Sequence, residues 1–67
     1  MSDKLKYESI EDVKIGDTFK IRLLGKLSNT IEILGENDNE YILQYVETRG
    51  TPRLYYKLRV VQNAIQI

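Results

Sequence analysis

The side chains best suited to binding chemistry lie close together in the stretch TPRLYYKLRVVQ, which runs from Thr51 to Gln62. If this stretch is an extended strand, alternate side chains point to opposite faces. Three cations and one aromatic ring then share one face, namely Arg53, Tyr55, Lys57 and Arg59. Cations neutralise phosphates or carboxylates, and a tyrosine ring stacks on a base. The pattern therefore predicts a ligand-binding site for an anionic partner: a nucleic acid, a nucleotide or an acidic protein surface.

The opposite face of the same stretch is apolar and is predicted to point into the core. It carries Leu54, Tyr56, Leu58 and Val60. The strand is expected to run from Arg53 to Val61, after a proline that cannot donate to a strand ladder. Among the tyrosines, we expect Tyr41 and Tyr56 to fill the core and Tyr55 to be exposed.

Two further cations, Lys20 and Arg22, extend the predicted site if the first strand lies beside the last one. They alternate with apolar residues in a strand expected from Thr18 to Leu24. A purely structural role is the alternative, because exposed strand cations often pair with acids on neighbouring strands. The acids available for such pairing are Glu32, Glu40 and Glu47. The sequence leaves both roles open.

The charge balance favours a local site over general nucleic-acid binding. Ten basic and ten acidic residues give a formal net charge of zero, whereas domains that bind nucleic acid non-specifically are usually basic. The charges are nevertheless separated along the chain, since residues 31–47 contain acids and no base, and residues 48–67 contain bases and no acid.

Catalytic and metal-binding motifs are missing from the sequence. There is no cysteine and no histidine, which excludes disulfides, zinc fingers, cysteine nucleophiles and Ser-His-Asp chemistry. The acidic run from Glu36 to Glu40 lacks the glycine of a calcium-binding EF-hand loop, and we expect a solvated turn there. We therefore expect a protein that is not an enzyme, with no catalytic residues, no metal site and no cofactor.

Short alternating segments separated by turn residues predict an all-β fold. Four strands are expected, with a short fifth one closing the sheet, at 18–24, 30–34, 40–48, 53–61 and 64–67. A helical turn beginning at Ser9 precedes them, and residues 1–8 are expected to be a flexible N-terminus. The predicted architecture of residues 9–67 is a single domain, a small antiparallel barrel of four to five strands.

This layout resembles that of SH3-like barrels in two places. One is the entry to the first strand, Val13-Lys14-Ile15-Gly16-Asp17, and the other is a short break before the last strand. The layout is also similar to that of Sm-like ring proteins, with a short leading helix, five strands and a late aromatic–lysine pair, here Tyr56-Lys57. Both resemblances cover most of the chain, and they imply architecture but not function.

Apolar residues at positions assigned to solvent suggest a second function, that of a protein–protein adaptor or inhibitor such as small phage proteins often are. Leu24, Leu34 and Val61 are the predicted interface residues, because exposed apolar patches often mark protein interfaces. An unpaired sheet edge would also allow a homo-dimer or higher oligomer. Alternatively, the N-terminal segment covers these residues.

The bulk composition indicates the class of protein and its expected location. No apolar run approaches the ~20 residues needed to span a membrane, and the start of the chain does not resemble a signal peptide. We therefore expect a cytoplasmic protein with no membrane partner. A composition rich in Ile, Asn, Lys and Tyr and poor in Ala fits a bacterial or viral origin.

Overall fold

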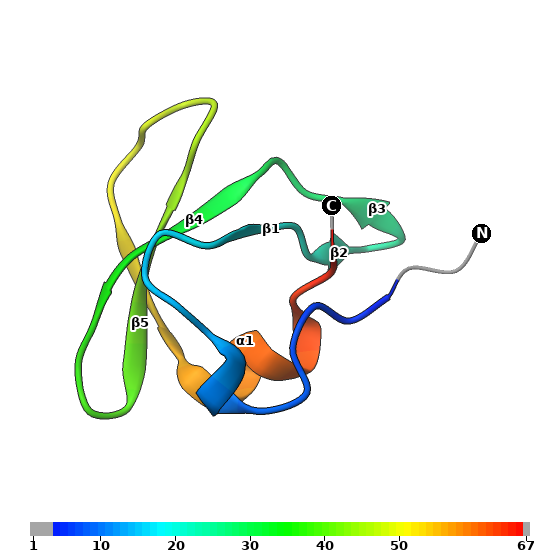
Figure 1. The fold of residues 1–67 in the computed structure, drawn as a ribbon. Helices are drawn as coiled ribbons and strands as arrows, with labels where there is room; N and C mark the ends of the chain where they lie inside the picture. Colours follow the sequence, from blue (N-terminus) through cyan, green and yellow to red (C-terminus); the bar gives the residue numbers. More distant parts are fainter. Residues whose placement is uncertain (1–3, 67) are drawn as a thin grey trace.

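The computed structural model describes residues 4–66 and is mostly β, with two antiparallel sheets and one short α-helix (Figure 1). The larger sheet has the strand order β1-β4-β5-β6, with bounds β1 Thr18–Phe19, β4 Ile31–Glu36, β5 Glu40–Tyr45 and β6 Arg53–Tyr56. The smaller sheet pairs β2 (Arg22–Leu23) with β3 (Lys26–Leu27). The β class is confirmed. Because the described residues pair as two separate sheets, the closed barrel stays a prediction.

One 3₁₀ turn and one helix complete the described structure: η1 (Ile10–Asp12) and α1 (Lys57–Asn63). The helical turn expected after Ser9 is confirmed, and the Asp12 carboxylate accepts the Ser9 N–H at 3.1 Å. Within residues 4–66, no helix has the length and hydropathy needed to cross a membrane.

The expected first strand, 18–24, is divided into β1 and β2 and ends in a tight hairpin. The two loop residues between β2 and β3 are Leu24 and Gly25, with φ values of 48° and 82°. Positive φ at both central positions is the geometry of a type I′ turn, whose twist matches that of the flanking strands. Glycine adopts it freely, but a leucine in this region is strained by roughly 1 kcal/mol. The Leu24 side chain is also fully exposed.

A β-bulge in β4 changes which side chains share a face. The pairing of β4 with β5 shifts between Ile33 and Gly35, so that Leu34 is an extra residue. Beyond the shift, Glu36 lies opposite Tyr41 and is therefore on the same face as that ring. The turn expected at 35–39 is correspondingly shorter, because β4 continues to Glu36 before the chain reverses.

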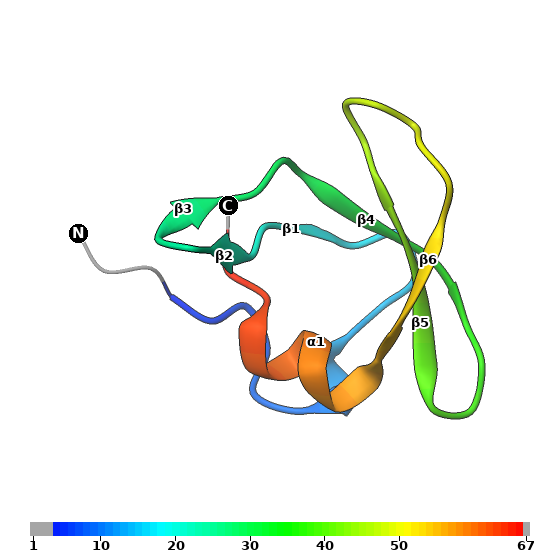
Figure 2. The same ribbon diagram turned by 180° about the vertical axis from the view of Figure 1, so that it is seen from behind.

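The core lies on one face of the four-stranded sheet, which we call the inner face. Its buried residues come from both ends and the middle of the chain: Tyr7, Phe19, Ile31, Ile33, Tyr41, Leu43, Val60 and Ala64. In Figure 2, β6 leads directly into α1, which returns below β1. Val60 and Ala64 are four positions apart and both buried, so α1 covers this face with one side. The prediction that Tyr41 fills the core is confirmed.

The strand expected from Arg53 to Val61 is wrong in its second half, because β6 ends at Tyr56 and α1 begins at Lys57. The predicted core face is therefore wrong for three of its four residues, since Leu54, Tyr56 and Leu58 have exposed fractions of 53%, 63% and 64%. Val60 is buried as expected, but from a helix. The segment from Lys57 to Asn63 contains no glycine or proline, and burial of Val60 with Ala64 rewards helical spacing over alternation.

Both ends of the described chain meet beside β1. Ile65 forms isolated bridges with Leu5 and with Lys20, in place of the longer fifth strand expected at 64–67. Ile67, like residues 1–3 of the expected N-terminal segment, lies outside the described residues. Within that segment Tyr7 is buried and donates its hydroxyl to Asp17 Oδ2 at 2.8 Å. This hydrogen bond ties the segment to the start of the sheet.

Candidate binding cleft at the free edge of β6

The pairing of β6 with β5 determines the direction of each β6 side chain. Tyr55 lies opposite Tyr41, and Arg53 lies opposite Leu43. Directly opposite residues of an antiparallel pair share a face, and Tyr41 and Leu43 are core residues. Arg53 and Tyr55 therefore belong to the inner face, and Tyr55 is 40% exposed there. The predicted alternation holds within β6, but its two faces are exchanged.

The outer face of the sheet carries the residues that the sequence assigned to the core. Leu54 lies opposite Ile42, and Tyr56 lies opposite Glu40. Neither Leu54 nor Tyr56 is covered by another element, as their exposed fractions above show. The outer face of β6 is thus an uncovered apolar surface.

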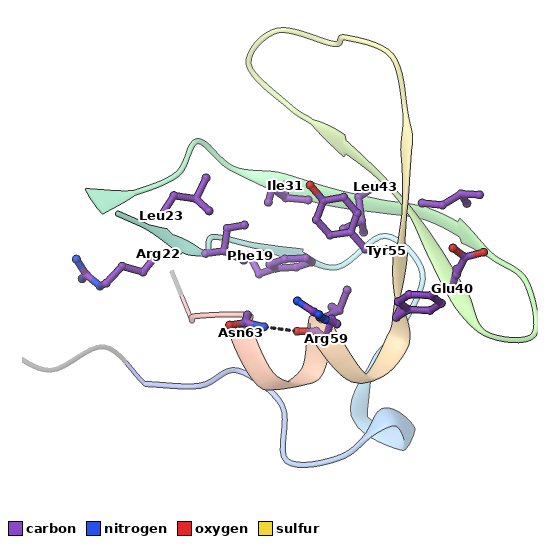
Figure 3. Close-up of a pocket in the computed structure, with 13 residues that line it drawn as sticks. Phe19, Arg22, Leu23, Ile31, Glu40, Leu43, Tyr55, Arg59 and Asn63 are labelled. Carbon is purple, nitrogen blue, oxygen red and sulfur yellow. Dashed lines mark hydrogen bonds between the residues drawn. The ribbon is translucent and has the colours of Figure 1, made fainter. Parts of the chain in front are cut away.

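A cleft of about 480 Å³ runs along β6 and reaches across to β2 (Figure 3). Its floor is formed by buried core residues, namely Phe19, Ile31, Leu43 and Val60. Ile21 and Leu23 form the wall opposite β6, and Asn63 adds a polar group from α1. The cleft therefore combines an apolar floor with an aromatic and polar rim.

Residues from both faces of β6 line this one cleft. Tyr55 belongs to the inner face, whereas Leu54, Tyr56 and Glu40 belong to the outer face. In Figure 3, Tyr55 and Glu40 lie on opposite sides of the β6 ribbon. The cleft therefore passes around the edge of β6 that faces away from β5.

The backbone of β6 offers hydrogen-bonding groups to that edge. Residues of an antiparallel pair alternate between hydrogen-bonded and non-hydrogen-bonded positions. The Lys57 N–H donates to the Asn39 carbonyl at 2.9 Å, so Tyr55 and Arg53, two and four positions earlier, also direct their backbone groups towards β5. Leu54 and Tyr56 direct theirs away from β5. Because β6 is the last strand of its sheet, this edge is unpaired within residues 4–66.

The structure brings together only some of the predicted ligand-binding residues. Arg22, Tyr55 and Arg59 line the same cleft, although they come from β2, β6 and α1. Arg53 and Tyr55 border a smaller hollow of about 40 Å³ farther along the inner face. Lys20 does not line the cleft, and its backbone pairs with that of Ile65.

Lys57 is held in a structural contact. Its ammonium group lies 2.6 Å from Glu36 Oε1 and 5.2 Å from the centre of the Tyr41 ring. The hydrogen bond to Glu36 raises the pKa of Lys57, although burial opposes that shift. We call Glu36, Tyr41 and Lys57 the seal, because they close the inner face at the start of α1.

Pairing with acids on neighbouring strands was the alternative to ligand binding for these cations. Some cations form such ion pairs and others do not. Arg49 Nη1 lies 3.7 Å from Glu32 Oε1, and Lys57 forms an ion pair with Glu36. Arg53 and Arg59 form no ion pair with any residue in the described range 4–66. Arg22 donates to the Gly25 carbonyl at 2.8 Å. Within residues 4–66, Arg59 is thus not neutralised by the acids that the sequence suggested.

The predicted interface residues Leu24, Leu34 and Val61 are not gathered into one patch. Leu24 lies at the tip of the β2–β3 hairpin, and Leu34 lies at the bulge of β4 with 39% exposure. Val61 is partly buried and packs against the core cluster from α1. The exposed apolar surface instead includes Leu54 and Tyr56, which sequence reasoning placed in the core.

Several lining residues were missed because they are distant in sequence. Phe19, Ile31 and Leu43 lie in expected strands but were not singled out as site residues, and Glu40 was expected only as a partner for cations. Asn63 lies between the strands expected at 53–61 and 64–67, but its side-chain amide donates to the Arg59 carbonyl at 2.8 Å within α1. The four-residue spacing of these two polar residues is the signal that places them on one helix face.

No family model, no curated protein and no solved structure matches the chain. Within residues 4–66, no group of three acidic, histidine or cysteine side chains is arranged to hold a metal ion.

Proposed function

We propose that this protein is a non-enzymatic binding module that recognises an anionic partner through the β6 cleft. The partner is a nucleic acid, a nucleotide or an acidic protein surface. The observation that supports this most directly is the position of Arg59, which lines an apolar cleft and has no ion pair in residues 4–66. Arg22 lines the same cleft, and Arg53 lies on the same sheet face.

The composition of the cleft suits a ligand with an apolar or flat part and a negative group. The volume of about 480 Å³ lies in the range of roughly 300–1,000 Å³ that is typical of ligand pockets. The Tyr55 ring offers a stacking surface, and the buried floor excludes water from one side of a bound group. Arginine then binds a carboxylate or phosphate through its planar fork of donors.

The proposal extends to the architecture and the location of the protein. We propose that the two sheets form an open version of an SH3-like or Sm-like roll, in which the cleft occupies the gap between β6 and β2. The short helix α1 before the final bridge at Ile65 supports this arrangement. A cytoplasmic location is part of the same proposal.

The test is a titration followed by amide chemical shifts, with three anionic probes at low salt. The probes are oligothymidylate, ATP and an acetylated, amidated eight-residue peptide of alternating Glu and Val. We expect one or more probes to shift the amides of Tyr55 and Arg59, and we expect the binding to weaken as salt increases. If none of the probes shifts these amides, or if salt has no effect, the proposed function is wrong.

A second function, that of a protein–protein adaptor or inhibitor, is supported by the uncovered outer face of β6. Leu54 and Tyr56 are more than half exposed there, and Leu34 adds a third apolar side chain on β4. The self-associating form of this function predicts a mass above that of a monomer in light scattering at high concentration. Leu34→Asp should restore the monomer mass. A monomer for the unmodified protein at all concentrations would exclude that form.

A further inference from the structure

We infer that the partner in the β6 cleft is an extended polypeptide segment with alternating apolar and acidic residues, which pairs with β6 as an added strand. This inference rests on the proposed function and names the class of anionic partner. It also assigns a role to the backbone of Leu54 and Tyr56, in addition to the side chains of the cleft.

The free edge of β6 favours a polypeptide partner. Leu54 directs both an N–H donor and a C=O acceptor away from β5, and Tyr56 directs its N–H the same way. An unpaired strand edge of this kind binds another extended chain through backbone hydrogen bonds. Nucleic-acid backbones present acceptors but no regular series of donors, so a polypeptide fits this edge better.

The lining of the cleft beside that edge also suits an added strand. Successive side chains of an added strand point to opposite faces of the sheet. Those pointing to the inner face would meet Phe19, Leu43 and Tyr55, and those pointing to the outer face would meet Leu54 and Tyr56. All five residues line the same cleft. A strand lying along β6 would therefore contact lining residues of the cleft with both sets of its side chains.

The charge of the cleft favours acidic residues in the added strand. Arg59 lines the cleft and has no ion pair within residues 4–66, whereas the Arg22 side chain points away from the cleft (Figure 3). A carboxylate at an inward position of the added strand would complement Arg59, whose side chain is exposed in the free protein. Among residues 4–66, Glu40 is the one acid that lines the cleft, and it lies on the outer face, opposite Tyr56. Acidic residues of the partner are therefore expected on the inner side.

The experiment measures binding of the Glu-Val peptide by amide chemical shifts and by calorimetry. Two comparison peptides have the same length: one alternates Lys and Val, and the other keeps the Glu-Val side chains but is N-methylated at every residue. We expect the Glu-Val peptide to bind, the Lys-Val peptide to bind far more weakly, and the N-methylated peptide to lose roughly tenfold or more in affinity. Equal binding by the N-methylated peptide would overturn the inference, because backbone pairing would then be unnecessary.

A matched pair of variants tests the same edge from the protein side. Leu54→Pro removes the outward N–H without removing a bond to β5, and proline is tolerated on edge strands. Leu54→Ala removes most of the side chain but keeps the N–H. We expect Leu54→Pro to weaken the Glu-Val peptide several-fold more than Leu54→Ala does. Equal losses would contradict backbone pairing. If circular dichroism shows that Leu54→Pro does not fold, backbone pairing is tested by the affinity of the N-methylated peptide relative to that of the Glu-Val peptide.

The remaining outcomes separate this inference from the proposed function. If oligothymidylate or ATP shifts the Tyr55 and Arg59 amides and the Glu-Val peptide does not, the strand inference is wrong and the anionic cleft stands. If no probe binds, both are wrong. If the protein forms dimers without any peptide, and Leu54→Pro makes them monomeric, the edge belongs to a second copy and the inference is overturned.

Discussion

Lys57 and Arg59 are two cations within one turn of α1, and they differ in whether an acid lies beside them. The Lys57 ammonium is placed between Glu36 and the Tyr41 ring, and it closes the inner face as part of the seal. Arg59 lines the open cleft and has no ion pair in residues 4–66. Whether a surface cation can bind a ligand therefore depends on the register of the strands beside it, because that register decides which acid lies next to the cation. The bulge in β4 brings Glu36 to Lys57, and no acid is brought to Arg59 in the same way.

The seal and the cleft are expected to differ most in how much one tyrosine of each contributes to the free energy of unfolding. Tyr41, in the seal, is 2% exposed, whereas Tyr55, in the cleft, is 40% exposed. We expect Tyr41→Ala to lower the free energy of unfolding by about 3–5 kcal/mol, as for other large core side chains. We expect Tyr55→Ala to lower it by less than about 1 kcal/mol. Urea denaturation of both variants measures the difference, and similar losses would contradict the division into a closed and an open region.

Removing one hydrogen bond to a charged group near the start of the sheet is expected to lower the free energy of unfolding by about 1.5–3 kcal/mol. Tyr7→Phe removes the hydroxyl that donates to Asp17 at 2.8 Å, and hydrogen bonds to charged groups are worth about this much. Thermal or urea denaturation at neutral pH measures the loss. A variant as stable as the unmodified protein would show that water replaces the hydroxyl at no cost.

The same contact predicts how stability depends on pH. Burial acts to raise the pKa of Asp17, but hydrogen bonds from the Lys14 N–H and the Tyr7 hydroxyl, with the Lys6 and Lys14 charges, lower it overall. A lowered pKa means that the folded state binds this proton less readily than the unfolded state. The contribution of Asp17 is therefore fully present above its ordinary pKa near 3.8 and is lost as pH falls through the folded value. Asp17→Asn should flatten this part of the acid-unfolding curve.

In the cleft, we expect Arg59→Ala to weaken roughly tenfold the binding of any anionic probe that shifts the Tyr55 and Arg59 amides of the unmodified protein. The free energy of unfolding should remain nearly unchanged. The exposed Lys14 provides a matched control, and Lys14→Ala should change affinity by less than about twofold, through long-range charge alone. Calorimetry at two salt concentrations measures both variants. Equal losses for the two would mean that only net charge matters and that the cleft does not.

The smallest expected effect concerns the hairpin that borders the cleft. Leu24 has a φ of 48° at the first central position of a type I′ turn, where asparagine is favoured. Leu24→Asn should therefore raise the free energy of unfolding by about 0.5–1 kcal/mol. A decrease would show that the exposed leucine makes a stabilising contact on the open side.

Much of the sheet could be predicted from alternation and turn residues, because one buried face imposes a period of two. Residues 31–34 and 40–45 fall in strands for this reason. The helix α1 could not be predicted from the same pattern, because the apolar residues of LYYKLRVV fit alternation as well as they fit a helix. The decisive partner, Ala64, lies beyond the stretch, and its burial with Val60 depends on tertiary packing. The bulge at Leu34 likewise depends on how β4 pairs, which no local signal specified.

For the site, the residue types were predicted better than their arrangement. Tyr55 and Arg59 were expected on one strand face, and they do line one cleft, but they come from a strand and a helix. The expectation that Tyr55 is exposed is confirmed, whereas Tyr56 was wrongly placed in the core. The two faces of β6 were exchanged in the prediction. The pairing of β6 with β5 puts Tyr55, and not Tyr56, on the same face as the buried Tyr41. A one-residue change in register reverses both faces of a strand.

The bridge between Lys20 and Ile65 also has a consequence for the order in which the chain folds. The hairpin of β4 and β5 joins neighbouring residues, so its loop closes early and at small entropic cost. Ile65 must travel back from the far end of the chain to reach both Lys20 and Leu5, which makes this closure slow. We therefore expect the bridges of Ile65 with Lys20 and Leu5 to form last, and the amides that join them to exchange with solvent sooner than those of β4 and β5.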